Sequence, residues 1–324
     1  MRTGERSGLN GSAERDASPT VSVVLPTHNR PLWLRTALGS VLEGDFQDLE
    51  VIVSNNGRLE HTRELAREID DPRVRWIEQK PSGMLEHFRA AMSLARGRYV
   101  AALYDDDWWH ASFLATLVPR LEDDPKVVVA FADQTQVHAD GELDVAATEY
   151  YSRTSGRASL APGLHRPFDH LAVRETVPIA GCVFRRQAVA PADLPLELGA
   201  AYDVWIAYLL ARMGGGAHYC PDRLVFLRGH ESSDFAAEPI PNLVAAASCQ
   251  RRMLRDPRLA PYRDELRRRL AAREQGIGAA LLRRGMRSEA REHLGAALRL
   301  RRTPKGAAAW AATRLVPASL LARL

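Results

Sequence analysis

Four short apolar runs, each separated from the next by a stretch with helical spacing, constrain the fold of this chain more than any other feature. The runs cover residues 21–25, 49–53, 74–77 and 99–103. Such runs, bounded by turn residues, predict buried strands. Helices are predicted between them, beginning at Pro31 and covering residues 60–69 and 84–95. This alternation favours the α/β class, with a single, mostly parallel, Rossmann-like sheet and helices on both faces.

The rest of the chain continues the pattern less regularly. Further helices are predicted over residues 111–121 and 203–213, and further strands over 127–131, 181–184 and 224–227. Scattered Gly, Ser, Arg and His predict a loop-rich insertion over residues 141–175. From Pro241 onward the pattern is helical. We therefore expect a disordered leader over residues 1–19, an α/β domain over 20–235 and an α-helical C-terminal extension over 236–324.

Charge is distributed unevenly along the chain. The formal net charge is +4, but residues 251–324 carry 19 Lys and Arg against 6 Asp and Glu, a balance of +13, so the remainder sums to −9. A basic end can meet an anionic membrane or an acidic partner. No basic run is interleaved with aromatic residues, so no nucleic-acid partner is expected.

Location and assembly are constrained only loosely. The three scattered cysteines and the lack of a long apolar window favour a cytoplasmic protein. Residues 310–324 are apolar with spaced Arg. They predict either peripheral contact with the inner face of a membrane, or packing against the rest of the chain or a second copy in a homodimer.

Three consecutive aspartates, Asp105, Asp106 and Asp107, follow the fourth predicted strand. Adjacent carboxylates repel one another unless a cation or hydrogen-bond donors lie among them. Oxygen-rich clusters suit Mg²⁺ or Mn²⁺, which in turn bind phosphates. In an α/β sheet, ligands bind beyond the carboxyl ends of the strands, where this cluster lies. The alternative is a solvated acidic turn that caps the following helix.

The first strand ends in the turn 26–31, PTHNRP. A dinucleotide-binding GxGxxG, a phosphate-binding GxxxxGK[ST] and a GxSxG elbow are all absent from the sequence. The hydroxyl, imidazole, amide and guanidinium groups of this turn suit a nucleotide base, a ribose and a diphosphate. The alternative is a turn that only caps a helix.

The order of these motifs, VSVVLPTHNRP, LEVIVSNNG and RGRYVAALYDDDWW, resembles the nucleotide-sugar half of family 2 glycosyltransferases with the A-type fold. The resemblance covers residues 21–230 and makes 20–235 the catalytic domain. It implies a metal-dependent, inverting transfer of a sugar from a nucleoside-diphosphate sugar to an acceptor hydroxyl in glycan or glycoconjugate biosynthesis. The implied donor-binding residues are Pro26, Thr27, His28, Arg30, Asn55, Asn56, Asp105 and Asp106. The implied ligands of Mn²⁺ or Mg²⁺ are Asp106, Asp107 and His230.

Residues 201–206 resemble a late acidic motif of the family. The resemblance makes Asp203 the candidate general base that deprotonates the acceptor hydroxyl. Asp203 could instead only cap the helix. At a helix start, the dipole is expected to lower its pKa. The chain departs from the family at Tyr202, where Glu is usual, and at Asn55, where Asp usually reads uracil. A uridine diphosphate donor remains the first expectation, with thymidine and guanosine diphosphates behind it.

Two other functions stay open at this point. A nucleotidyltransferase would also place carboxylates and a metal on a similar sheet, and a non-catalytic nucleotide-sugar-binding protein would keep the fold. The acceptor is not indicated and could be a lipid-linked glycan, a polysaccharide, a peptide or a small metabolite. Of Trp108 and Trp109, one is expected to stack on a sugar ring and the other to lie in the core.

Overall fold

The computed structural model describes residues 18–79, 83–230 and 239–315, so all but the end of the predicted leader lies outside the described residues. The first half alternates strands and helices as the sequence predicts. Its elements are β1 (Val21–Thr27), α1 (Pro31–Leu42), β2 (Leu49–Asn55), α2 (Leu59–Glu68), β3 (Val74–Glu78), α3 (Met84–Ser93) and β4 (Tyr99–Ala102).

The second half of the α/β domain is less regular, with several short elements. These are β5 (Trp108–Trp109), α4 (Phe113–Glu122), β6 (Val127–Val137), α5 (Val145–Thr154), β7 (Gly163–His165), α6 (Asp169–Val173), β8 (Cys182–Arg185), the 3-10 segment η5 (Leu196–Ala201), α7 (Tyr202–Arg212) and β9 (Gly216–Arg228).

The loop-rich insertion predicted over residues 141–175 instead contains α5, β7 and α6. The prediction was wrong because polar contacts fix α5 to the sheet. The sequence of α5 therefore lacks the helical spacing of apolar residues by which a helix is recognised. Asp144 caps the helix by accepting a hydrogen bond from the Ala147 N–H. The buried Thr148 hydroxyl oxygen accepts from the Gln136 N–H of β6, at 2.8 Å.

The α/β class is confirmed, and the sheet is mixed rather than mostly parallel. The strand order is β3-β2-β1-β4-β8-β6-β9-β5, with β7 also pairing with β9. Strands β3, β2, β1 and β4 are parallel to one another, whereas β8 runs antiparallel to both β4 and β6. The crossover helices α1, α2 and α3 connect the parallel strands β1 to β4, whereas a long segment that contains α5, β7 and α6 precedes β8.

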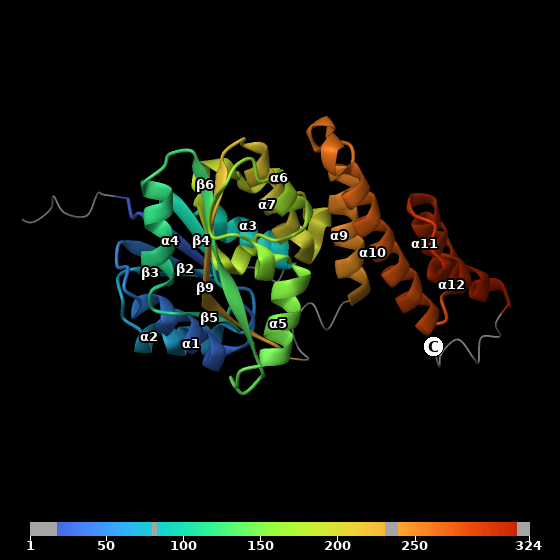
Figure 1. Ribbon diagram of the computed structural model, residues 1–324. Coiled ribbons are helices and arrows are strands. Elements are labelled where there is room, and N and C mark those ends of the chain that lie inside the picture. Colours follow the sequence, from blue (N-terminus) through green and yellow to red (C-terminus); the bar gives the residue numbers. More distant parts are fainter. Residues whose placement is uncertain (1–17, 80–82, 231–238, 316–324) are drawn as a thin grey trace, which may run out of the picture.

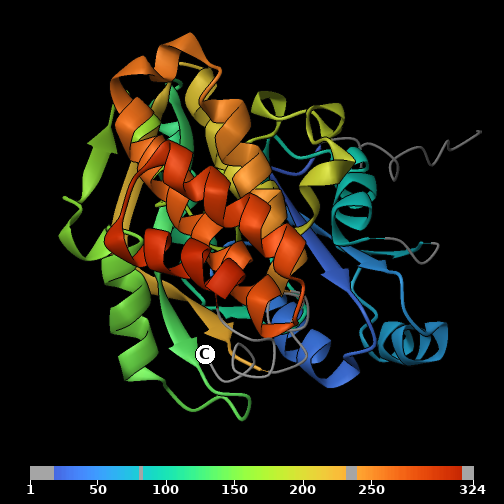
Figure 2. The same ribbon diagram turned by 90° about the vertical axis from the view of Figure 1, so that its right-hand side faces the viewer.

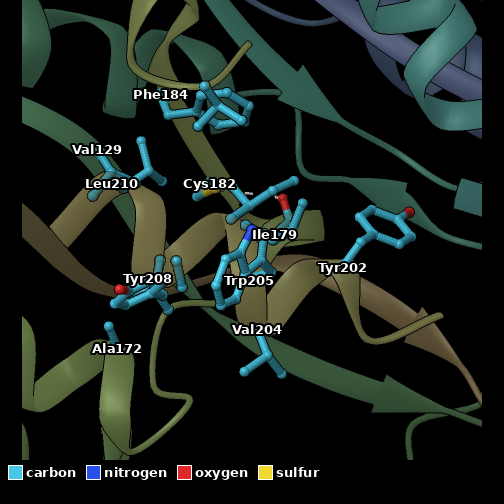
Figure 3. Close-up of a cluster of buried hydrophobic side chains, with 14 of the residues drawn as sticks. Val129, Ala172, Ile179, Cys182, Phe184, Tyr202, Val204, Trp205, Tyr208 and Leu210 are labelled. Carbon is cyan, nitrogen blue, oxygen red and sulfur yellow. Dashed lines mark hydrogen bonds between the residues drawn. The ribbon is translucent and has the colours of Figure 1, made fainter. Parts of the chain in front are cut away.

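Helices cover both faces of the sheet (Figure 1). On one face, α1, α2 and α4 bury side chains such as Leu38 and Leu117 against β1, β2 and β6. On the other face, α3, α6 and α7 form a second apolar cluster with β8. Figure 3 shows part of this second cluster, including Trp205 and Tyr208 of α7 with Phe184 of β8. The sheet is therefore buried on both sides, and polar groups are left for its edges and strand ends.

Four helices follow the domain: α9 (Pro239–Met253), α10 (Arg263–Arg283), α11 (Arg287–Leu300) and α12 (Pro304–Leu315). They stack beside one another in the view of Figure 2. Leu270, Ile277 and Leu294 belong to their own small core, and Trp310 packs against it. Residues 316–324 lie outside the described part of the chain. No helix in the described ranges is long and apolar enough to span a membrane.

The parallel register brings three strand ends to one place. Thr27 pairs with Asn55, so β1 and β2 end together. Beyond β4, the Leu103 N–H donates to the Val24 carbonyl at 3.0 Å, which carries the chain alongside the last residues of β1. The acidic cluster therefore emerges next to the β1–α1 turn.

Gly97 allows β1 to lie close to the approach to β4. A Cβ atom at Gly97 would lie 2.5 Å from the Ser22 nitrogen, a backbone atom that cannot move away alone. We expect Gly97→Ala to lower the free energy of unfolding by about 1–3 kcal/mol, the usual effect of overpacking. Chemical denaturation measures this change.

Gly276→Ala, in the interior of α10, is the matched control. Its added methyl group would meet only Leu243 Cδ1 at an ordinary 3.7 Å. Because Ala favours helix over Gly, this variant should gain up to about 1 kcal/mol. Equal stability changes in the two variants would contradict the close approach at Gly97.

Candidate active site

Asp105 joins the end of β4 to the β1–α1 turn. One of its oxygens accepts hydrogen bonds from the Thr27 hydroxyl at 2.9 Å and the His28 N–H at 3.0 Å. The other oxygen accepts from Arg30 Nη1 at 3.0 Å. Burial raises the pKa of Asp105, and the neighbouring Asp106 charge raises it further, while these donors act in the opposite direction. Asp105 is thus a buried carboxylate that holds the turn.

Asp106 links the same turn to the end of β9. Its Oδ2 accepts from Arg30 Nη1 at 3.0 Å and lies 2.8 Å from His230 Nε2. Arg30 therefore bridges Asp105 and Asp106, and it neutralises part of the repulsion between them. His230, a residue 124 positions further along the chain, points at the acidic cluster.

Asp107 is fixed by the backbone of β9. Its Oδ1 accepts from the Arg228 N–H at 2.9 Å, and Arg228 Nε donates to the Asp106 carbonyl at 3.1 Å. Burial raises the pKa of Asp107 well above its usual range, and the Asp106 charge adds to this effect.

Aromatic rings enclose these charged groups. Trp33 packs on His230 with ring centroids 4.6 Å apart, and the Arg228 guanidinium lies 5.2 Å from the Trp33 centroid. Trp108 is half-buried and stacks on Phe226. Trp109 is buried in the core, as expected for one of the two tryptophans, while the sugar-stacking role of the other stays a prediction.

A cavity of about 660 Å³ opens beside the turn. Five of the predicted donor-binding residues line it: Pro26, Thr27, His28, Asn56 and Asp105. Gly83, Met84 and His87 of the α3 region continue this wall. The opposite wall comes from η5 and α9, through residues such as Leu196, Asn242 and Val244. The C-terminal extension therefore helps to enclose the cavity.

The two asparagines after β2 lie differently. Asn56 Oδ1 is 2.8 Å from His28 Nδ1, at the cavity wall. Asn55 is 1% exposed, and its Oδ1 accepts from the Gly57 N–H at 2.8 Å. Asn55 therefore shapes the turn after β2, and Asn56 is the one that lines the cavity.

Asp203 does not line this cavity. It lines a second recess of about 370 Å³, together with Gln134, Gln136, Tyr151 and Arg174. Asp203 lies in the first turn of α7, and its Oδ1 accepts from the Val204 N–H at 2.7 Å.

The environment of Asp203 reverses one expectation. A lowered pKa was predicted from the helix dipole, but the surrounding protein raises the pKa of Asp203 to about 6, because desolvation outweighs the backbone hydrogen bond. The residue itself is exposed to solvent, which tempers desolvation. The carboxyl therefore takes up its proton at higher pH than an ordinary aspartate does.

Tyr104 lines the first cavity and contacts the buried Tyr202. Their hydroxyls lie 2.6 Å apart, and Tyr202 packs against Phe88 with ring centroids 4.7 Å apart. Burial raises the pKa of Tyr104 well above its usual range, and the charges of Asp203 and Asp107 contribute. Tyr202, which stands where the family usually has Glu, is therefore a buried packing residue.

The side chains around Asp106 can be compared with the ligands that a divalent metal ion requires. Among the described residues, no group of three or more His, Cys, Asp or Glu side chains could hold a metal ion. Asp106 Oδ2 and His230 Nε2 nevertheless lie together, and oxygen and imidazole donors both suit Mn²⁺. Mg²⁺ and ions like it are often held by one or two protein ligands plus substrate phosphates. The residues fit an ion that binds with a diphosphate.

Three contributors to this region were not identified from the sequence. Trp33 lies two residues after Pro31, and Arg228 lies two residues before His230, so their spacing from recognised residues could have indicated them. His87 lies in the first turn of α3, in a segment with no recognised motif.

Comparison with known proteins agrees with this arrangement. Residues 22–173 match the model of the family described as glycosyl transferase family 2, so this region of the chain belongs to that family. A GalNAc(5)-diNAcBac-PP-undecaprenol beta-1,3-glucosyltransferase from Campylobacter jejuni is 31% identical over 112 residues, which cover 32% of this chain and 35% of that protein.

A chondroitin synthase from Pasteurella multocida is 27% identical over 127 residues, or 39% of this chain. The match spans 13% of the length of that relative.

Two solved structures share the fold over nearly the whole chain. TarS 1-349 from S. aureus, in complex with UDP-GlcNAc, has a TM-score of 0.67 at 12% identity, covering 94% of this chain and 89% of that one. The mannosyltransferase PcManGT from Pyrobaculum calidifontis, in complex with GDP-Man and Mn²⁺, has a TM-score of 0.59 at 19% identity, covering 95% and 84%.

The contacts of Asp105 yield a prediction. In Asp105→Asn, an amide NH₂ replaces one of two acceptor oxygens and faces donors from the turn. We expect the free energy of unfolding to fall by about 1–3 kcal/mol, because a buried donor loses its partner. Chemical denaturation measures it, with Asp140→Asn on the exposed surface as the control. Unchanged stability would show that the turn does not depend on this carboxylate.

Proposed function

We propose that this chain is a metal-dependent, inverting glycosyltransferase that moves a sugar from a nucleoside-diphosphate sugar to an acceptor hydroxyl. The observation that carries the proposal is the turn held by Asp105, which lies against the acidic cluster and opens into a cavity large enough for a nucleotide. In α/β sheets, ligands bind beyond the carboxyl ends of the strands, where this cavity opens.

The donor is placed along the cavity. Thr27 and His28 line the end assigned to its diphosphate, where Arg30 contacts Asp105 and Asp106, and Asn56 lines the same cavity. Asp106 and His230, with Asp107 beside them, would hold Mn²⁺ or Mg²⁺. When bound, such an ion neutralises the charge that develops on the departing diphosphate. The UDP-GlcNAc and GDP-Man complexes of the structural relatives support a donor of this class, and a uridine diphosphate is favoured.

Asp203 acts as the general base in this proposal. The acceptor hydroxyl oxygen bonds to the anomeric carbon while the bond from that carbon to the phosphate oxygen breaks. The hydroxyl proton passes to Asp203, and the nucleoside diphosphate leaves with the electron pair. Single displacement inverts the anomeric centre. The second recess, which Asp203 lines with Gln134 and Gln136, is the place for the acceptor.

Substitutions at the two sites separate their roles. Asp106→Ala should abolish both metal-dependent donor binding and turnover. Asp203→Asn should keep donor binding and lose turnover by at least about 10²-fold, since general base catalysis contributes 10²–10⁴. Release of nucleoside diphosphate from a panel of nucleotide sugars, with Mn²⁺, measures turnover.

Asp264→Asn is the control for both, because the Asp264 side chain is fully exposed on α10, remote from the cavity lining. Full turnover in Asp203→Asn would refute the base assignment. Donor binding without turnover in the unmodified chain would favour a non-catalytic binding protein.

The raised pKa of Asp203 predicts the pH profile. A base must be deprotonated, so kcat/KM falls as pH drops through the pKa of the free enzyme's base. Because that pKa is raised from 3.8 to about 6, the acidic limb should lie near pH 6. Initial rates between pH 4.5 and 8 measure it. A limb near pH 4 would contradict the assignment, since it would belong to an unperturbed carboxyl.

A further inference from the structure

A recess of about 410 Å³ lies apart from the candidate active site. It is formed by the C-terminal half of α7, the end of α9, and the 3-10 segment η6 (Pro257–Tyr262) that precedes α10. It shares no lining residue with the donor cavity or with the recess of Asp203. Figure 1 shows the connection between α9 and α10 at the upper end of these helices, whereas α1 lies at the lower edge of the molecule. Four of the seven lining residues are arginines: Tyr208, Arg212, Arg252, Arg255, Asp256, Pro257 and Arg258.

Asp256, the one carboxylate in this lining, is already engaged. Its Oδ2 accepts a hydrogen bond from the Tyr208 hydroxyl at 2.8 Å, and its Oδ1 accepts from the Arg258 N–H at 2.9 Å. The Arg258 Nε lies 3.4 Å from Asp256 Oδ2, within ion-pair distance. Arg258 and Asp256 therefore balance one another within the wall of the recess.

The other arginines of the recess differ in their partners. Arg252 forms an ion pair with Glu197. Within residues 18–79, 83–230 and 239–315, neither Arg212 nor Arg255 forms an ion pair with a carboxylate. The Arg212 guanidinium lies 5.7 Å from the centroid of the Tyr208 ring, and Arg255 is exposed. The recess therefore carries two positive charges that no carboxylate of the described chain balances.

The ends of the helices do not account for both charges. Cations are favourable near a helix C-terminus, and Arg212 lies in the last turn of α7. The last carbonyl of α7 already has a donor, however, because Arg258 Nη1 donates to the Arg212 carbonyl at 2.9 Å. Arg255 lies two residues beyond the end of α9 at Met253, outside the helix. A bound anion would account for the excess charge of both side chains.

The chemistry of the recess matches a phosphomonoester. Such a group carries a charge close to −2 near neutral pH and presents three strong acceptor oxygens. Each guanidinium can offer two parallel N–H donors to phosphate oxygens. The volume of about 410 Å³ falls in the range of small-molecule sites, so it also has room for the organic part of a phosphate ester. Pro257 supplies apolar surface for that part.

We propose that this recess binds a phosphomonoester group between Arg212 and Arg255, on a soluble phosphate ester or on a lipid headgroup. The site is separate from the proposed donor site and requires no divalent ion. It gives part of the basic C-terminal region a defined ligand, in place of a general attraction to anions.

Binding assays at low salt, with EDTA present, test the proposal. EDTA removes the divalent ion on which the proposed donor site depends. The probes are glycerol phosphate, measured by isothermal titration, and phosphatidylcholine vesicles that contain phosphatidic acid, measured by co-sedimentation. Both probes present the same phosphomonoester. The unmodified chain should bind at least one of them. Arg212→Ala and Arg255→Ala should each bind at least about tenfold more weakly, the effect of losing one hydrogen bond to a charged group.

Two further variants keep the result clear. Arg299→Ala removes an exposed arginine in the last turn of α11, which like Arg212 forms no ion pair with a described carboxylate, and it should bind as the unmodified chain does. Arg255→Lys keeps the charge but loses the paired donors, so it should retain part of the affinity. Arg255→Ala should be as stable as the unmodified chain, because no ion pair within the described ranges is lost.

The two probes distinguish the source of the phosphate. Binding of glycerol phosphate would identify a soluble ester as sufficient, and binding of the vesicles alone would identify the lipid headgroup; both results support the site. Failure of the unmodified chain to bind either probe would overturn it. Equal weakening in Arg255→Ala and Arg299→Ala would also overturn it, since binding would then follow overall charge.

Discussion

A single buried carboxylate, Asp105, organises the polar end of the sheet. Burying a charge is costly unless hydrogen bonds replace its water, and the Thr27 hydroxyl, the His28 N–H and Arg30 supply them. The β1–α1 turn is therefore shaped to satisfy a residue that follows β4. That requirement fixes where Arg30 lies, and Arg30 in turn reaches Asp106.

The same contacts extend to the end of β9. His230 reaches Asp106, and Arg228 holds Asp107 through its backbone. Trp33 contacts both His230 and Arg228. Three segments that are far apart in the sequence thus meet around three aspartates. Their charges are partly balanced within the protein, which explains how the cluster can be buried.

The sequence predicted those parts of the fold that depend on periodicity. β1 to β4 and their helices follow apolar spacing, and the acidic cluster was expected at the strand ends where it lies. The sequence did not predict α5, which is anchored by Thr148, or the antiparallel direction of β8. Neither a polar anchor nor the direction of a strand produces a periodic pattern of apolar residues. The raised pKa of Asp203 and the burial of His87 depend on packing between remote segments, which one sequence does not display.

The walls of the cavity come from segments far apart in the chain: Thr27 and His28 from the β1–α1 turn, Asn242 and Val244 from α9. Bringing such distant segments together closes a long loop, which costs conformational entropy. A nascent or partly folded chain therefore lacks a complete pocket. Nucleotide occupancy would then report that folding is finished, and free donor would stabilise only the mature molecule.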